Sequence, residues 1–165
     1  MRVCIQCLGC YNEGKLNFKW YNRDELRENL DDLNPCKRAD HEEYMMADMD
    51  YYAKRFGEYP DYEKVLEFMD LIDEYGEPFE IWVCYAGDID HLEKHEIEEK
   101  FIDEYVGEYS EREYAEEYLE YDLKDLNPLI ACNINYEGVW IDLKHNGYYS
   151  QNTGFPNYTN YIFRS

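Results

Sequence analysis

The chain has 165 residues, with 16 Lys or Arg against 38 Asp or Glu, and carries a formal net charge of -22. A chain of this length can bury a core as one domain or as a few small ones. Its content of 18% aromatic and 45% apolar residues separates it from disordered acidic chains. The charge excludes direct binding to nucleic acid, because proteins that bind nucleic acid do so through a basic surface. It also disfavours an anionic membrane as a partner.

The negative charge is confined to the middle of the sequence. Residues 1–40 hold seven basic and seven acidic side chains, and residues 131–165 hold two of each. Residues 41–130 hold seven basic and 29 acidic side chains, so the whole net charge lies there. A protein adapted to high salt would spread carboxylates over its entire surface, and this distribution therefore disfavours that explanation.

The first residues and the cysteines predict a cytoplasmic protein. The N-terminus shows no long apolar run followed by a small-residue cleavage site. No window approaches the ~18 consecutive apolar residues that a membrane span needs. In a reducing compartment cysteines stay free thiols, and we expect this of all six. They are Cys4, Cys7, Cys10, Cys36, Cys84 and Cys132.

The N-terminal part of the chain predicts a β-hairpin. Residues 2–8 form a short β-like run, and residues 16–20 alternate apolar Leu16, Phe18 and Trp20 with polar residues, as a half-buried strand does. Asn12-Glu13-Gly14 supplies the turn between them.

A short helix and a third strand complete the predicted N-terminal domain. Asp24 can cap a helix that ends before Asn34-Pro35. Its apolar face consists of Leu26, Leu30 and Leu33. Residues 43–51 have the composition of a strand. We therefore expect residues 1–60 to form a small α+β domain with an antiparallel sheet and a short helix.

The middle of the chain, residues 61–106, predicts an acidic helical domain. Asp61 is a good N-cap for the clearest helix, and Gly76 lies where a C-terminal cap is expected. The apolar face of this helix carries Val65, Phe68, Met69 and Ile72. Residues 79–86 fit either a buried strand or a short apolar helix, because periodicity does not separate the two at this length. Residues 90–105 are helical in pattern.

The last part, residues 107–165, predicts a further α+β domain. Ser110 and Glu113 form a capping box at the start of a helix that carries Tyr114, Tyr118 and Tyr121 along one face. Asn135 can cap a last helix through Trp140 and Leu143, ended by Asn146-Gly147. The tail contains Tyr158, Ile162 and Phe163 among polar residues and has a β pattern. The fold class as a whole is α+β.

Carboxylates line the predicted outer face of three helices, two in the middle part of the chain and one in the last part. At ~100° per residue they fall on the side opposite the apolar face, with rises of ~4.5 to 6 Å between neighbours. These candidate residues are Glu63, Glu67, Asp70 and Glu74 in the first helix, Glu96, Glu99 and Asp103 in the second, and Glu113, Glu117 and Glu120 in the third.

These rows of carboxylates have two possible interpretations. They are ordinary solvated faces, or their electrostatic field is the function. Like charges at helical spacing cost a few tenths of a kcal/mol per pair, and lysines are too few to offset them, which favours the second interpretation. Duplex DNA carries one charge per ~1.7 Å, so 22 charges correspond to about eleven base pairs. Such a surface would attract the basic cleft of a DNA-binding enzyme.

No catalytic, cofactor or metal site is predicted. On a strand Cys4 and Cys7 face opposite sides, and no fourth ligand follows Cys10 at usable spacing, so these cysteines are interpreted as structural thiols. His91 and His95 lack the His-Glu-x-x-His order and a third ligand. The three serines include none in a Gly-x-Ser-x-Gly motif. We expect a protein that is not an enzyme.

Several motifs, distributed in order over nearly the whole chain, resemble those of one known family. They are Tyr11-Asn12-Glu13-Gly14-Lys15-Leu16 with Trp20, Glu58-Tyr59-Pro60-Asp61-Tyr62-Glu63, Asp73-Glu74-Tyr75-Gly76, Tyr105-Val106-Gly107-Glu108-Tyr109-Ser110 with Tyr114-Ala115-Glu116-Glu117, and Asn135-Tyr136-Glu137 with Asp142-Leu143 and Gly147. In these motifs the chain resembles the ArdA antirestriction proteins. It departs from them at Gly138-Val139-Trp140 and in the tail after Gly147.

The resemblance implies a function and a partner. ArdA proteins are carried by mobile elements and protect incoming DNA from Type I restriction–modification enzymes. They are elongated dimers of small domains in series, and their surface carboxylates imitate the phosphates of bent B-form DNA. The implied partner is the methyltransferase core of such an enzyme. No cofactor is expected for the protein itself. The alternative hypothesis is an acidic adaptor or chaperone for basic proteins, although the chain lacks a flexible acidic tail.

The resemblance also bears on two structural questions. The helical middle of the family implies that residues 79–86 are a helix. The family's dimer contact lies in the C-terminal part, where this chain has an apolar group that forms either the interface or ordinary core. The group consists of Leu129, Ile130, Ile134, Val139, Trp140 and Ile141.

Overall fold

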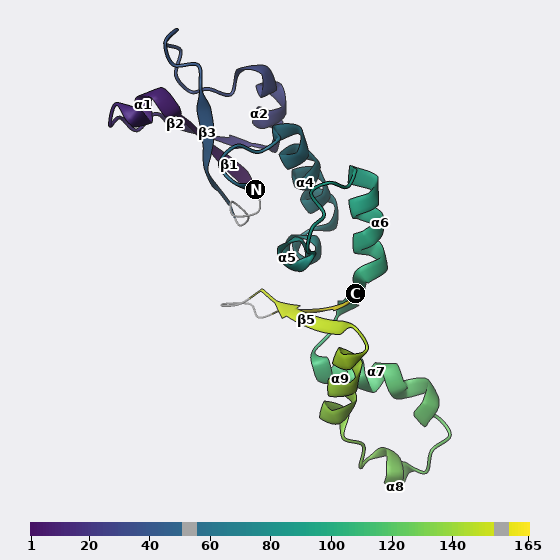
Figure 1. The fold of residues 1–165 in the computed structure, drawn as a ribbon. Coiled ribbons are helices and arrows are strands. Elements are labelled where there is room, and N and C mark those ends of the chain that lie inside the picture. The colour runs from purple at the N-terminus through teal and green to yellow at the C-terminus, as the bar shows by residue number, and fades with distance from the viewer. Residues whose placement is uncertain (51–55, 154–158) are drawn as a thin grey trace. The chain divides into compact units, whose positions relative to one another are not determined.

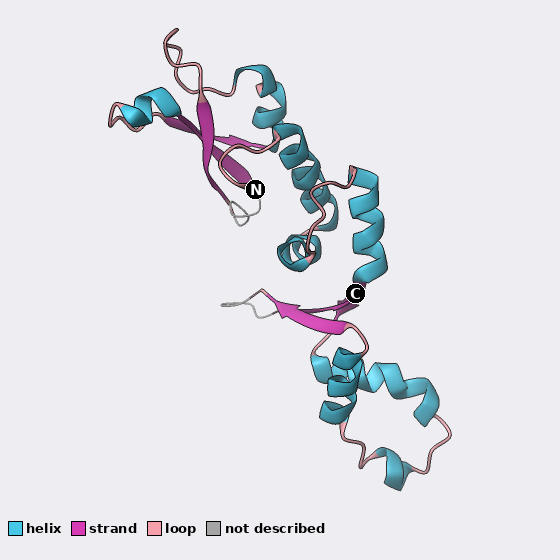
Figure 2. Cartoon of the chain, viewed as in Figure 1, coloured by secondary structure: helices cyan, strands magenta, loops and turns pink. Residues whose placement is uncertain are grey.

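The protein is a mixed α+β protein with two small antiparallel sheets. The structure is a computed structural model that describes residues 1–50, 56–153 and 159–165. These residues form two compact units, Met1–Gly76 and Glu77–Ser165, each with one three-stranded sheet and several helices (Figures 1 and 2). The predicted α+β class is confirmed. The division into domains at residues 60/61 and 106/107 stays a prediction.

The sheet of the first unit has the strand order β2-β1-β3. Its strands are β1 (Arg2–Cys7), β2 (Phe18–Asn22) and β3 (Tyr44–Met49), and both pairings are antiparallel. The predicted hairpin and third strand are thus present, although the far end of that strand, at Tyr51, lies outside the described residues. The connection between β1 and β2 differs from the expected tight turn. It contains a short helix, α1 (Leu8–Asn12), because the Cys7 sulfur accepts a hydrogen bond from the Cys10 N–H.

The predicted buried face of β2 is wrong. Leu16 lies before the strand and is 76% exposed, and Phe18 is 51% exposed, whereas Tyr21 is buried. The pairing register explains the difference, because Val3 lies opposite Tyr21 and Cys4 opposite Trp20. Val3 and Tyr21 therefore share the face that packs in the core, and the residues that alternate with Tyr21 point to the other face.

A helix and a 3₁₀ turn follow β2, as α2 (Arg23–Glu28) and η1 (Leu30–Asp32). The expected cap at Asp24 is wrong, because Asn22 is the N-cap. Its side chain accepts the Glu25 N–H at 3.0 Å, and the Glu25 carboxylate accepts the Asn22 N–H at 3.0 Å. This reciprocal capping box satisfies two backbone donors at the helix start. Leu26 and Leu33 are buried as expected.

The long helix α4 (Tyr62–Tyr75) begins and ends as predicted. The Asp61 side chain accepts hydrogen bonds from the N–H groups of the first turn, and Gly76 ends the helix with φ of 67°. Val65 and Met69 pack in the same core cluster as the strand residues Val3 and Ile5. The helix therefore belongs to the core of the first unit.

Two helices and a strand open the second unit. They are α5 (Glu77–Tyr85), α6 (Lys94–Glu104) and β4 (Tyr105–Glu108). Helix α5 confirms the expectation drawn from the family for residues 79–86. The rings of Phe79, Trp82 and Phe101 lie 5.2 to 5.5 Å apart, centroid to centroid, and join the two helices. The helix predicted over residues 90–105 is present as Lys94–Glu104, and Tyr105 begins a strand.

Within the described residues, three further helices and two strands complete the second unit. They are α7 (Glu111–Leu123), α8 (Pro128–Ala131), α9 (Tyr136–His145), β5 (Tyr148–Asn152) and β6 (Asn160–Arg164), and the sheet order is β4-β6-β5. The caps predicted at Ser110 and Asn135 are confirmed, because each accepts a backbone N–H three residues on. The predicted β pattern of the tail is confirmed by β5 and β6; Tyr158 lies outside the described residues.

The core of this part differs from the expected tyrosine stripe on α7. Ala115 is buried with Trp140, Leu143 and Ile162, and Tyr114 packs against them. Tyr118 and Tyr121 are 50% and 87% exposed. The small side chain of Ala115 lets α9 approach α7 closely, so the tyrosines that follow lie beside the contact.

Candidate functional site

Helix α6 carries an exposed row of three carboxylates, Glu96, Glu99 and Asp103. Buried Ile97 and Phe101 fix the opposite side of the helix in the core. Successive members of the row rise by ~4.5 and ~6 Å along the axis, since each residue adds 1.5 Å. Glu96 also accepts the N–H of Glu93 at 2.8 Å and so stabilises the helix start. The row is thus held on an ordered helix.

Helix α7 carries a second exposed row, Glu113, Glu117 and Glu120, opposite buried Ala115. Hydrogen bonds from the side chain and the backbone of Ser110 hold the pKa of Glu113 below its ordinary value. The Glu117 carboxylate accepts the hydroxyl of Tyr109 at 3.1 Å. The first interaction favours the ionised form of Glu113, and the second orients the Glu117 side chain at the surface.

These two rows lack compensation by cations. None of the six carboxylates forms an ion pair within the described part of the chain. Two cations of the same helices pair with other carboxylates, Lys100 with Glu104 and Arg112 with Glu116. In sequence, the second unit holds 20 acidic and 6 basic side chains. The rows are therefore a strong and ordered negative surface.

The row predicted on α4 is partly neutralised. Glu67 pairs with Lys64 at 2.8 Å, and Asp70 pairs with Arg27 of α2 at 2.6 Å. The other two members, Glu63 and Glu74, are exposed. The fold brings Arg27 to α4 from 43 residues away, so counting cations along α4 alone did not show this pairing.

The apolar group considered for a dimer contact is divided between core and surface. Trp140 is only 3% exposed and packs in the core. Ile134 and Val139 are half-buried. Leu129 and Ile130 of α8 and Ile141 of α9 are 75%, 59% and 49% exposed. Only this last set offers free apolar surface.

A cluster of thiols and one imidazole lies in the first unit. The ligand atoms of Cys7, Cys10, Cys36 and His41 all lie within 4.8 Å of one another, and the four side chains are buried. Among the described residues no comparable group forms around the exposed His91 and His95. The backbone N–H of Arg38 lowers the pKa of Cys36 to about 7.

Only two of these four residues stand among the cysteines considered as metal ligands from the sequence. Cys7 and Cys10 were expected to be structural thiols together with Cys4, which is buried elsewhere on β1. Cys36 and His41 were not predicted to join them. The signal was present as Cys-x2-Cys at residues 7–10 and Cys-x4-His at residues 36–41, two spacings that are typical of zinc sites.

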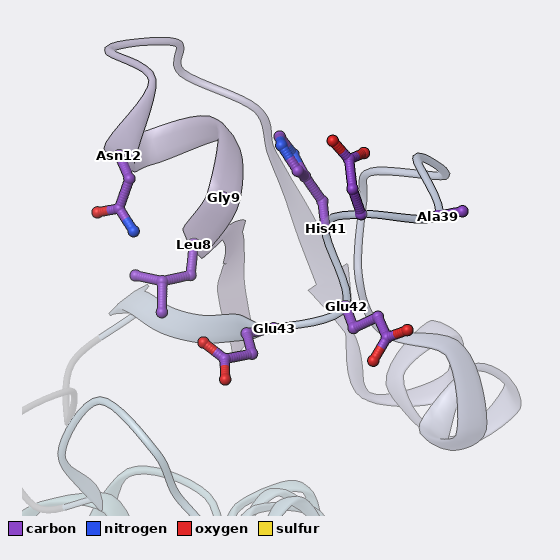
Figure 3. A pocket seen from close by; sticks show the side chains of 8 residues that line it. Leu8, Gly9, Asn12, Ala39, His41, Glu42 and Glu43 are labelled. Carbon is purple, nitrogen blue, oxygen red and sulfur yellow. The ribbon is translucent and has the colours of Figure 1, made fainter.

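A pocket lies beside the cluster, between α1 and the segment before β3. Figure 3 shows its lining, which includes Leu8, Gly9 and Asn12 from one side and His41 and Glu43 from the other. His41 thus lines the pocket and also contacts the three thiols.

The fold and the two carboxylate rows define a class, that of acidic α+β proteins whose candidate site is a set of charged helix faces. The family model described as antirestriction protein (ArdA) matches residues 3–156. The chain belongs to this family and is an antirestriction protein. No curated protein matches it. Among the described residues no helix has the length and apolar character required to cross a membrane.

Proposed function

We propose that this antirestriction protein is a DNA mimic. In the proposal, the carboxylates of α6 and α7 occupy the DNA-binding groove of a Type I restriction–modification enzyme in the place of phosphates. The methyltransferase core of the enzyme is the partner, and DNA of the incoming mobile element escapes cleavage. The protein performs no chemistry in this mechanism, because occupation of the groove is sufficient to inhibit.

One observation carries the proposal. Six exposed carboxylates stand on two ordered helices at rises of ~4.5 to 6 Å, without an ion-pair partner among the described residues. Like charges at helical spacing oppose folding slightly. Their retention on ordered helices is explained if a basic groove offsets the repulsion on binding, as basic grooves do for the phosphates of DNA.

Helix α4 contributes less to the proposed surface. Its exposed members Glu63 and Glu74 extend the negative field, but Glu67 and Asp70 already have cations beside them. A basic groove would have to compete with Lys64 and Arg27 for these two carboxylates. We therefore assign the main contribution to α6 and α7.

We also propose that the active species is a homodimer. Leu129 and Ile130 present exposed aliphatic side chains from the four-residue helix α8, and Ile141 does so from α9. A second copy of the chain is the occupant proposed for this surface. Two copies would present two sets of carboxylate rows to the enzyme.

Competition for a purified Type I methyltransferase tests the proposal. The measurement is the concentration of protein that displaces duplex DNA. The test variant is Glu96→Gln with Glu99→Gln and Asp103→Asn. The control removes the same three charges from exposed positions of the first unit, by Glu28→Gln, Asp31→Asn and Glu42→Gln. Exposed charges contribute up to about 1 kcal/mol each, so we expect roughly tenfold weaker competition for the test variant and less than about twofold for the control.

Three outcomes would contradict this account. Equal losses in the test and control variants would show that only the total charge matters. Complete loss from one substitution among the six would indicate a discrete site instead of a collective surface. Binding of unrelated basic proteins as tight as binding of the methyltransferase would support the acidic adaptor instead.

A further inference from the structure

The buried cluster in the first unit has the composition of a metal site. It holds three thiols, from Cys7, Cys10 and Cys36, and the imidazole of His41. Three cysteines and one histidine are a common ligand set of structural zinc sites, and thiolate ligands select Zn²⁺ over Mg²⁺ or Ca²⁺. The geometry points to a structural zinc site, and we propose that these four side chains bind one Zn²⁺.

The distances within the cluster agree with a tetrahedron around one metal ion. Zn–S bonds of about 2.3 Å and Zn–N bonds of about 2.0 Å place two sulfurs ~3.8 Å apart and a sulfur ~3.6 Å from the nitrogen. The Nδ1 atom of His41 lies 3.6 Å from the Cys7 sulfur, 3.4 Å from that of Cys10 and 3.7 Å from that of Cys36. The sulfurs of Cys10 and Cys36 are 3.6 Å apart. The three distances from this nitrogen to the sulfurs thus agree with those between neighbouring ligands of a tetrahedral zinc ion.

The backbone around the first two ligands is shaped to hold them. The Cys10 N–H donates to the Cys7 sulfur at 3.4 Å, and the Asn17 amide donates to the Cys10 sulfur at 3.6 Å. Such donors stabilise a thiolate. At Gly9 between them, an added Cβ would lie 2.6 Å from Cγ of His41. Only glycine therefore allows the imidazole to approach the two cysteines.

The second nitrogen of His41 has the partner expected of a metal-bound histidine. Its Nε2 lies 3.2 Å from Oε1 of Glu13. Glu13 is itself held by Arg38 at 2.9 Å and by Lys15 at 2.8 Å. A carboxylate on one ring nitrogen orients the ring and leaves the other nitrogen as ligand. Nδ1 is consequently the ligand atom.

The ligands connect two segments that are distant in sequence. Cys7 and Cys10 lie at the junction of β1 and α1, whereas Cys36 and His41 lie in residues 33–43, a fully described connection with neither helix nor strand. The Asn34 side chain supports that connection by donating to the His41 carbonyl at 2.7 Å. A metal ion here would fix the connection against the sheet. A disulfide is the competing explanation, but the Cys10 and Cys36 sulfurs are 3.6 Å apart, well beyond the ~2.05 Å of a bond.

Metal analysis of the full-length protein, purified under reducing conditions, tests the site. We expect about one equivalent of zinc per chain, measured by mass spectrometry of the metal. After exchange with Co²⁺, we expect the intense visible bands of a tetrahedral complex together with a thiolate charge-transfer band. Less than a tenth of an equivalent of zinc without the Co²⁺ bands would overturn the proposal. A Cys10–Cys36 disulfide in intact protein that has not been exposed to oxidant would overturn it too.

Variants separate a metal site from a merely buried cluster. Cys36→Ser should reduce bound zinc at least tenfold, and the buried Cys4→Ala and exposed Cys132→Ser should keep the full content. Because Cys36→Ser can also unfold the unit, Glu13→Gln provides a second readout that retains all four ligands. Loss of such an outer partner weakens metal affinity by about 10- to 100-fold. Unchanged zinc affinity in Glu13→Gln together with full zinc content in Cys36→Ser would refute the site.

Discussion

Phe101 shows how single core residues hold the carboxylate row of α6 in place. It is 2% exposed, and its ring lies 5.2 Å from that of Phe79 and stacks on Tyr105 at 5.4 Å. The next residue, Ile102, is 54% exposed. The neighbouring positions thus provide a buried and an exposed apolar residue on the same helix.

Substitution of these two neighbours tests the assignment of the core. Phe101→Ala should lower the free energy of unfolding by about 3–5 kcal/mol, because it leaves a cavity among aromatic rings. Ile102→Ala should change it by less than about 0.5 kcal/mol, as exposed substitutions do. Urea unfolding followed by circular dichroism measures both. Similar losses of stability for the two variants would show that the buried face assigned to α6 is wrong.

Glu113 provides a prediction about pH. Its folded-state pKa is lowered by hydrogen bonds from Ser110, so its contribution to stability is present above the ordinary glutamate pKa of about 4.3 and is lost as the pH falls through the lowered value. Glu113→Gln should therefore be less stable than the original protein at pH 7. The difference in the free energy of unfolding should shrink below about pH 4.

Glu120→Gln is the matched control for that titration, because Glu120 lies on the same helix and has no hydrogen bond within the described residues. It removes one charge from the same helix without removing a capping hydrogen bond, so at pH 7 it should change the free energy of unfolding less than Glu113→Gln does. A difference for Glu113→Gln that stays constant or grows on acidification would contradict the capping role.

At the scale of elements, helix starts could be predicted from sequence because caps are local. Asp61, Ser110 and Asn135 each bond to backbone groups within three residues. The outward face of the strand β2 could not be predicted, since pairing with β1 determines it. The strand β4 was not predicted because its first residue, Tyr105, continues the four-residue spacing of Ile97 and Phe101 in α6.

For the candidate sites too, local features could be predicted from the sequence and contacts between distant segments could not. The carboxylate rows of α6 and α7 could be found from helical periodicity alone, because each lies on one element. The cations beside Asp70 come from Arg23 and Arg27 on another helix. The partners of Cys7 and Cys10 lie 26 or more residues further along the chain. Contacts of this kind depend on the tertiary fold.

Helix α8 carries the prediction about self-association. Leu129→Asp combined with Ile130→Asp should convert a dimer to a monomer, because each would place a charge in the proposed apolar contact. Leu16→Asp is the matched control, since Leu16 is 76% and Leu129 75% exposed. Light scattering after size-exclusion chromatography measures the mass. A dimer that persists in the double variant, or a monomer in the original protein, would contradict the proposed interface.

At the scale of the whole molecule, the two units differ in how far their charge is compensated. The first unit holds 18 acidic and 10 basic side chains, and the second holds 20 and 6. In the first unit, basic side chains such as Arg23, Arg27 and Arg38 form ion pairs with its own carboxylates. The uncompensated charge is therefore concentrated in the second unit, where α6 and α7 carry the exposed rows.

The salt dependence of binding to a purified Type I methyltransferase is the most direct test of DNA mimicry. Binding should be measured without DNA, because the affinity of DNA itself falls with salt. We expect the dissociation constant to rise on the order of tenfold or more between about 50 and 200 mM salt. The slope should be shallower for Glu96→Gln with Glu99→Gln and Asp103→Asn than for the matched control variant of the first unit. A dissociation constant that stays constant across the salt series would contradict the account.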